Sequence, residues 1–258
     1  MPTTIFIYTY IFILGLVLGS FYNVVGLRIP LKQSIVYPGS ACPVCNKKLS
    51  PLELIPVFSY LFQGGTCKNC KTHISSLYPS MELTTAILFT ISPLLVGWSK
   101  ELILAWSLIS LCMIVTVSDL KYMIIPDKVN LFFLVLFAGE RILLVPATPW
   151  WDPLLGFLIG GIVPLLIILV SRGGMGGGDM KLLAVFGIIL GWKLVLLSFF
   201  LATLIGTIVG LIGMATGVVK KGKPFPFGPF LVIGALLAYF FGNEMIDLYM
   251  SHFFSYLY

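Results

Sequence analysis

The chain has 258 residues, of which 59% are hydrophobic and only 10% are charged, and its mean hydropathy is +1.04. A soluble domain carries about 25% charged residues, so this composition excludes an ordinary soluble protein and predicts several membrane-spanning helices. The net charge of +6 does not indicate a nucleic-acid partner, because the basic residues follow the pattern of a protein oriented in a membrane.

Eight apolar runs predict membrane helices. The first run, at 5–18, has no basic residue before it and no A-x-A-like site after it, so we expect a retained helix and not a signal peptide. The run at 180–192 is short, since a bilayer takes about 20 residues, and seven spans is the alternative count. We predict an all-α polytopic membrane protein with about eight transmembrane helices. The expected spans are 4–25, 83–98, 102–118, 129–146, 154–171, 180–192, 194–217 and 226–242.

The basic residues predict the orientation of these helices. If the polar insert at 26–81 faces the cytoplasm, 13 of the 16 basic residues fall on cytoplasmic segments. Only Lys100, Arg141 and Lys193 fall on the other side. Lys and Arg are enriched in cytoplasmic loops, so we expect a multi-pass protein of the inner or plasma membrane with a cytoplasmic insert.

Three domains are expected from the same pattern: a first transmembrane helix at 1–25, the insert at 26–81 and a membrane-embedded domain at 82–258. A basic cluster near the end of the chain is expected to contact anionic lipid. It consists of Lys220, Lys221 and Lys223.

The insert contains two C-x-x-C pairs separated by 21 residues. Each pair can present two thiolates to one ion, and two pairs complete the tetrahedral four-sulfur site of structural zinc. Two disulfides are the alternative, which a cytoplasmic location disfavours because thiols stay reduced there. A closed four-sulfur site leaves no position for a substrate, so we expect a structural role. The predicted ligands are Cys42, Cys45, Cys67 and Cys70.

The strongest candidate for catalysis is Asp179, which directly follows a glycine-rich stretch at 173–178 and lies between two uncharged apolar runs. Ionisable groups at such positions are costly and are usually functional. Gly176 and Gly178 would let another extended chain approach the backbone. The expected partner is Asp119, which also follows a long apolar run and which we favour over Asp127. The alternative is a simple interhelical loop, in which Asp179 only caps a helix.

Two aspartates at one face of the membrane indicate acid–base hydrolysis. Neighbouring carboxyl groups cannot both ionise cheaply, so one keeps a proton. The ionised group can then take a proton from water, while the protonated group polarises a peptide carbonyl. The sequence contains neither G-x-S-x-G nor H-E-x-x-H, and its two histidines, His73 and His252, have no supporting motif.

In these residues the chain resembles the type IV prepilin leader peptidases of the G-x-G-D family of membrane aspartyl proteases. The resemblance runs nearly end to end and is closest to competence-type members from Gram-positive bacteria. It is carried by Gly19-Ser-Phe-Tyr-Asn-Val-Val25, both C-x-x-C pairs, Asp119 with Ile125-Pro-Asp127, Gly176-Gly-Gly-Asp179 with Lys181, and Pro226-Phe-Gly-Pro-Phe230.

The resemblance implies a bifunctional enzyme whose catalytic residues are Asp119 and Asp179. Such an enzyme cuts a short basic leader from prepilin or pseudopilin precursors and then methylates the new N-terminus with S-adenosylmethionine. Its zinc-binding insert accompanies the second activity. Two other classes remain open: a transporter or channel with intramembrane aspartates, and a non-catalytic pilus assembly factor that binds a partner through the insert.

Overall fold

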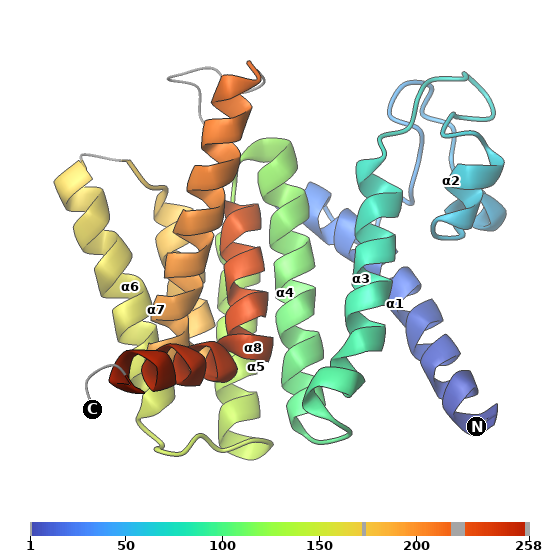
Figure 1. Ribbon diagram of the computed structural model, residues 1–258. Coiled ribbons are helices and arrows are strands. Elements are labelled where there is room, and N and C mark those ends of the chain that lie inside the picture. The colour runs from blue at the N-terminus through green and yellow to red at the C-terminus, as the bar shows by residue number, and fades with distance from the viewer. Residues whose placement is uncertain (1, 172–173, 218–224, 256–258) are drawn as a thin grey trace. The chain divides into compact units, whose positions relative to one another are not determined.

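The computed structural model describes residues 2–171, 174–217 and 225–255. Within these ranges every regular element is helical, which confirms the predicted all-α class (Figure 1). The chain forms two compact units, Met1–Gly97 and Trp98–Tyr258. The elements are α1 Pro2–Arg28, η1 Pro51–Leu54, α2 Phe58–Phe62, α3 Leu77–Val96, α4 Glu101–Tyr122, α5 Asp127–Leu143, α6 Asp152–Ser171, α7 Gly177–Ala215 and α8 Gly228–Ser255.

The first unit is built on the packing of α1 against α3. Two glycines of α1 make this packing close: a Cβ added at Gly15 would lie 2.6 Å from the Cα of Ala86, and one at Gly19 would lie 2.8 Å from the Cα of Glu82. Small residues at such positions let membrane helices approach backbone to backbone. The polar insert therefore connects two helices, α1 and α3, that are tightly packed against each other.

The insert has few regular elements of its own. Glu53 in η1 accepts hydrogen bonds from the backbone N–H (2.9 Å) and the hydroxyl (2.8 Å) of Ser50, which hold the start of this short helix. The insert is tied to α3 by Glu82, whose carboxylate accepts the N–H of Val57 at 2.7 Å. Val57 has a φ of 61°, a region that β-branched residues rarely adopt.

The second unit is organised around α4. The helix is apolar on all sides, and Leu104, Leu108, Leu111 and Val115 are fully buried. A helix of this kind is stable only when other helices cover it. Helices α5 and α8 pack directly against α4, and α7 packs against α5, α6 and α8.

The element α7 contains a chain reversal. Gly191 has φ 76° and ψ 175°, which is not helical, and the segments before and after it run side by side in opposite directions (Figure 1). A straight helix of 39 residues would be about 58 Å long, well beyond the ~30 Å hydrocarbon core of a bilayer. The reversal falls at the boundary between the spans expected at 180–192 and 194–217.

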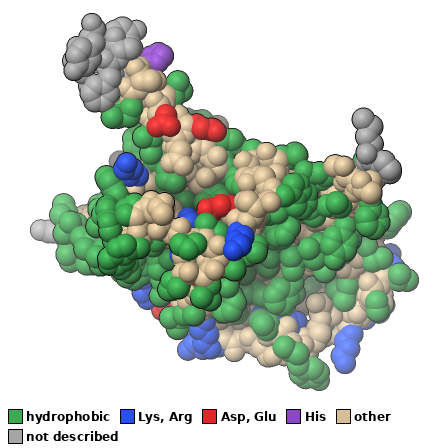
Figure 2. Space-filling model, turned by 90° about the horizontal axis from the view of Figure 1, so that it is seen from below, with side chains coloured by type: hydrophobic (Ala, Val, Ile, Leu, Met, Phe, Trp, Pro, Cys, Tyr) green, Lys and Arg blue, Asp and Glu red, His purple; other side chains and the backbone are tan. Residues whose placement is uncertain are grey.

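Six helices in the described residues are long and apolar enough to cross a membrane. The count is below eight because α7 holds two antiparallel segments and because α5, with 17 residues, falls short of the usual span length. Large apolar side chains such as Phe132, Val135 and Val170 are exposed, and apolar side chains dominate the surface seen in Figure 2. Such a surface suits lipid, and the chain is a multi-pass membrane protein.

Candidate active site and metal centre

Asp119 lies in the last turn of α4, at the contact with α8. The helix ends at Met123, whose left-handed φ of 54° lets its N–H bond to the carbonyl of Asp119 at 2.8 Å. The Asp119 side chain is only 5% exposed, and its Oδ2 accepts the N–H of Gly228 at 2.8 Å. One backbone donor from the first residue of α8 therefore orients this carboxylate.

Asp179 is the third residue of α7. Its Oδ2 accepts the N–H of Gly176 at 3.2 Å, so the carboxylate satisfies one of the free donors at the start of the helix. A negative charge is also favourable there because of the helix dipole. The alternative role as the helix N-cap is therefore wrong in detail, since Gly176 is the N-cap and Asp179 lies three residues inside.

The two aspartates are brought together from segments sixty residues apart. The C-terminus of α4, which carries Asp119, and the N-terminus of α7, which carries Asp179, lie at the same end of their unit (Figure 1). Gly178 makes this approach possible, because a Cβ at this position would lie 3.1 Å from the Cβ of Ile125, just after α4. Each of the two carboxylates is held by a backbone N–H at this end of the unit.

Asp127, the competing aspartate, has a different environment. It begins α5 and forms an ion pair with Lys181 at 2.8 Å, in which both side chains are at least half exposed. Neither ion pair of the described ranges includes Asp119 or Asp179. A carboxylate held by a cation is a poorer general base than one that faces a second carboxylate.

Gly228 is a site residue to which the sequence assigned no role. A Cβ at this position would lie 2.7 Å from Oδ2 of Asp119, so only glycine leaves room for the carboxylate. Gly228 belongs to the segment Pro226-Phe-Gly-Pro-Phe230, which carries part of the family resemblance and could have indicated a role for this glycine. The contact joins residues 109 positions apart, and no local pattern marks such a pair.

The four cysteines of the insert form one cluster. All four Sγ atoms lie within 4.8 Å of one another, with Cys42 and Cys70 at 3.6 Å and Cys45 and Cys67 at 4.0 Å. Sulfur atoms about 2.3 Å from a tetrahedral zinc would be about 3.8 Å apart, whereas a disulfide needs about 2.05 Å. The cysteines are free thiols, so the cluster can hold a metal and the disulfide alternative is wrong.

Both C-x-x-C pairs are folded in the same way. In each turn the N–H of the residue after the second cysteine bonds to the carbonyl of the first, Asn46 to Cys42 and Lys71 to Cys67, both at 2.9 Å. Asn46 and Lys71 have left-handed φ angles of 54° and 57°. The repeated geometry turns two local sequences into two matching halves of one site.

Hydrogen bonds favour the thiolate form of two of the four cysteines, Cys45 and Cys70. Thr72 bonds to the Cys70 sulfur at 3.3 Å through its hydroxyl, and this contact together with the Thr72 backbone lowers the pKa of the Cys70 thiol to about 6. The backbone N–H of Lys47 and the side chain of Asn69 lower the pKa of Cys45. Thiolates are the metal-binding form of cysteine, so these contacts favour metal binding.

Comparison with known proteins gives one family. Residues 13–96 match the Bacterial Peptidase A24 N-terminal domain, and residues 106–211 match the Type IV leader peptidase family. Similar curated proteins are named Prepilin leader peptidase/N-methyltransferase. The relative from Bacillus subtilis (strain 168) is 45% identical, over 93% of this chain and 97% of its own length. Those from Pseudomonas aeruginosa and Aeromonas salmonicida are 33% and 32% identical, over at least 92% of each chain. No solved structure matches.

Proposed function

The chain belongs to the type IV leader peptidase family, and we propose that it cleaves the leader from prepilin precursors and then methylates the new N-terminal amine. Relatives that carry both activities in their names match it over nearly their whole length. The observation that supports the peptidase is the position of Asp119 and Asp179 at neighbouring ends of α4 and α7, where Gly178 lies against Ile125. The methyl donor that we propose is S-adenosylmethionine.

In the proposed reaction Asp119 and Asp179 act as one acid–base pair. The ionised member takes a proton from a water molecule, which attacks the scissile carbonyl, and the protonated member donates a hydrogen bond to the carbonyl oxygen. The proton taken from water then passes from the first aspartate to the leaving amine. The support is geometric: both carboxylates are held by backbone N–H groups, and neither forms an ion pair within the ranges that the structure describes.

We propose that Gly176 and Gly178 admit the substrate to this pair. A Cβ added at Gly178 would lie 3.1 Å from the Cβ of Ile125, which is closer than most Cβ contacts. A Cβ added at Gly176 would lie 3.0 Å from Oδ2 of Asp179. Exchanging either glycine for alanine should slow processing without loss of protein. Normal processing in both variants would contradict this role.

We propose zinc as the metal of the four-cysteine cluster, because a soft tetrahedral sulfur site suits this ion. Its role is structural, since four sulfurs fill the coordination sphere. The insert and the aspartate pair face the cytoplasm in this proposal. The expected lipid contact of Lys220, Lys221 and Lys223 falls outside the described residues and stays a prediction. The proposed domains keep the boundaries 1–25, 26–81 and 82–258.

The decisive experiment is a cleavage assay on membranes. Wild-type protein, Asp119→Asn and Asp179→Asn are mixed with a prepilin precursor, and the product masses are read. We expect both variants, at normal protein levels, to lose cleavage by about a thousandfold or more. With S-adenosylmethionine, the wild-type product should gain the mass of one methyl group in place of one hydrogen.

Other results would change the assignment of the catalytic residues or the class of protein. Cleavage that survives only in Asp119→Asn would transfer the role to Asp127. Cleavage that survives in both variants would remove the aspartate mechanism. A transporter or channel is disfavoured because its charged groups usually lie at mid-bilayer, whereas Asp119 and Asp179 lie at helix ends.

A further inference from the structure

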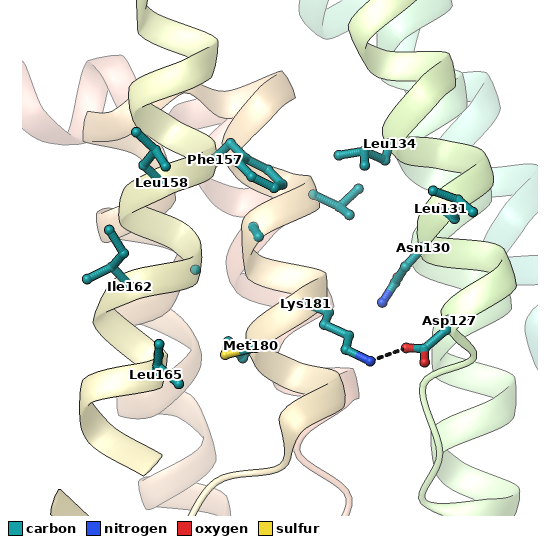
Figure 3. A pocket seen from close by; sticks show the side chains of 13 residues that line it. Asp127, Asn130, Leu131, Leu134, Phe157, Leu158, Ile162, Leu165, Met180 and Lys181 are labelled. Atoms are coloured by element: carbon teal, nitrogen blue, oxygen red, sulfur yellow. Dashed lines mark hydrogen bonds and ion pairs between the residues drawn. The ribbon is translucent and has the colours of Figure 1, made fainter. Parts of the chain in front are cut away.

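The second unit has an apolar groove that the acid–base pair does not use. It encloses about 560 Å³ between α5, α6 and α7, and it is lined mainly by leucine, isoleucine, phenylalanine and methionine side chains (Figure 3). One end is polar, where Asp127 and Lys181 form their ion pair. Met180 and Lys181 directly follow Asp179 in α7, so this polar end adjoins the proposed active site.

Asn130 is the unusual residue of this groove. Its side chain projects from α5 towards Lys181 (Figure 3), and the residue is only 4% exposed. Neither its Oδ1 nor its Nδ2 has a hydrogen-bond partner among the described residues. An unsatisfied buried amide costs about 1–3 kcal/mol, so a groove built only for packing would carry an apolar residue here.

We propose that this groove binds the apolar segment of the precursor that follows the cleaved bond, and that Asn130 hydrogen-bonds its backbone. The inference rests on the proposed function. A carboxamide offers one acceptor and two donors, which match the N–H and C=O of a peptide. The first N–H groups of a helix lack partners within the helix, so Oδ1 can accept one while Nδ2 donates to a carbonyl nearer the scissile bond.

The dimensions and lining of the groove favour this occupant. From Asp127 to Leu134, α5 rises by about 10 Å, enough for two turns of a bound helix. Beyond the polar end, the walls of the groove are apolar. The charged side chains of a basic leader would lose their hydration there, so the apolar segment of the precursor fits the groove better than the leader does. A lipid acyl chain would satisfy the walls but not Asn130, because its carbons form no hydrogen bonds.

The first test separates binding by Asn130 from a structural role. In Asn130→Leu we expect KM for the precursor to rise about tenfold for each lost hydrogen bond, with little change in kcat. Thermal unfolding in detergent should not occur at a lower temperature, because an unsatisfied amide is removed. Ser198→Ala is the matched control, since Ser198 is also buried, has no hydroxyl partner in the described part of the chain, and does not line the groove. An unchanged KM in Asn130→Leu, or a lower unfolding temperature with it, would overturn the assignment.

A second variant fills the groove without disturbing the fold. A Cβ at Gly161 would meet only the Cβ of Ala184, at an ordinary 3.7 Å. Gly161→Leu should therefore keep the protein level and raise KM. Gly139→Leu on α5 is the control, because a Cβ there meets nothing within 4 Å and the residue does not line the groove. Equal kinetics in the two variants would contradict the proposal.

The occupant is identified by photo-cross-linking in the Asp179→Asn background, where the precursor stays uncut. Leu131 and Phe132 are both 62% exposed on α5, but only Leu131 lines the groove. A benzophenone amino acid at 131 should capture the precursor within its apolar segment, and one at 132 should not. Capture of lipid alone at 131, or equal capture at both positions, would overturn the proposal. Failure of the proposed function would instead show as absence of cleavage by the wild-type protein, measured separately.

Discussion

At the scale of single residues, the main choice is between Asp119 and Asp127. The sequence favoured Asp119 because it continues an apolar helix, and this choice stays a prediction. The structure supplies a physical argument for it: Asp119 is buried against a backbone donor, whereas Asp127 is exposed and paired with Lys181. The partner of Asp127 could not be predicted, because it lies 54 residues away on another helix.

This difference predicts the behaviour of Asp127→Asn. An exposed ion pair contributes at most about 1 kcal/mol, so the variant should fold with nearly normal stability. Its kcat for cleavage should stay within a small factor of the wild-type value, in contrast to Asp119→Asn. The measurement is the initial rate at saturating precursor. A loss as large as that of Asp119→Asn would contradict the assignment of Asp119.

Gly228 gives a second prediction at this scale. A methyl group here would lie against Oδ2 of Asp119, so Gly228→Ala should displace the carboxylate and slow cleavage by about tenfold or more. Thermal unfolding should change much less than activity. Gly210→Ala is the control, because a Cβ at Gly210 meets nothing within 4 Å, and it should cleave normally. Normal activity in Gly228→Ala would show that the Gly228 contact does not position Asp119.

At the scale of elements, the chain reversal inside α7 determines where the active-site helix can lie. The sequence predicted a break between the runs at 180–192 and 194–217, and it placed the helices well because apolar runs of membrane length are a strong local signal. It could not single out Gly191 among 26 glycines. The residue is marked by its left-handed φ and by Asp152, which accepts the N–H of Trp192 at 3.4 Å.

Gly191→Ala should therefore destabilise the second unit. A φ of 76° with a ψ of 175° is a conformation essentially restricted to glycine and costs about 1–3 kcal/mol for other residues. The new methyl group would also collide with the Asp152 carboxylate. We expect a lower unfolding temperature in detergent than for the wild-type protein. Gly210→Ala should not lower it, since alanine is the better helix former at an open position. Equal unfolding temperatures would contradict the role of Gly191.

The two C-x-x-C turns are the element that the sequence predicted most completely, because the ligand spacing and the turn geometry are both local. The purified protein should contain about one zinc per chain, measured by elemental analysis. Cys42→Ser should lose the metal and make the insert sensitive to protease. Cys112→Ala should keep it, since Cys112 is buried in α4, outside the cluster. Full zinc content in Cys42→Ser would contradict the predicted ligand set.

At the scale of the whole molecule, a second group of charged and polar side chains gathers far from the aspartates, and several of its members bond to one another. Arg141 lies 3.6 Å from Glu101 and donates to the carbonyl of Ile189, while Tyr239 donates to Glu101 at 3.1 Å. Ser107 donates to the buried Glu140 at 2.6 Å. Charge counting placed Arg141 on the side opposite the insert, but the partners of Arg141 come from several helices and could be identified only from the fold.

The predicted orientation can be tested on intact cells. Val36 in the insert is 83% exposed, and Trp150, between α5 and α6, is 76% exposed, so a cysteine at either position should react readily. A membrane-impermeant maleimide should label Trp150→Cys in intact cells and label Val36→Cys only after permeabilisation, because basic segments stay in the cytoplasm. The unsubstituted chain gives the background from the natural cysteines. The opposite pattern would place the aspartate pair outside the cell, where a leader retained in the cytoplasm could not reach it.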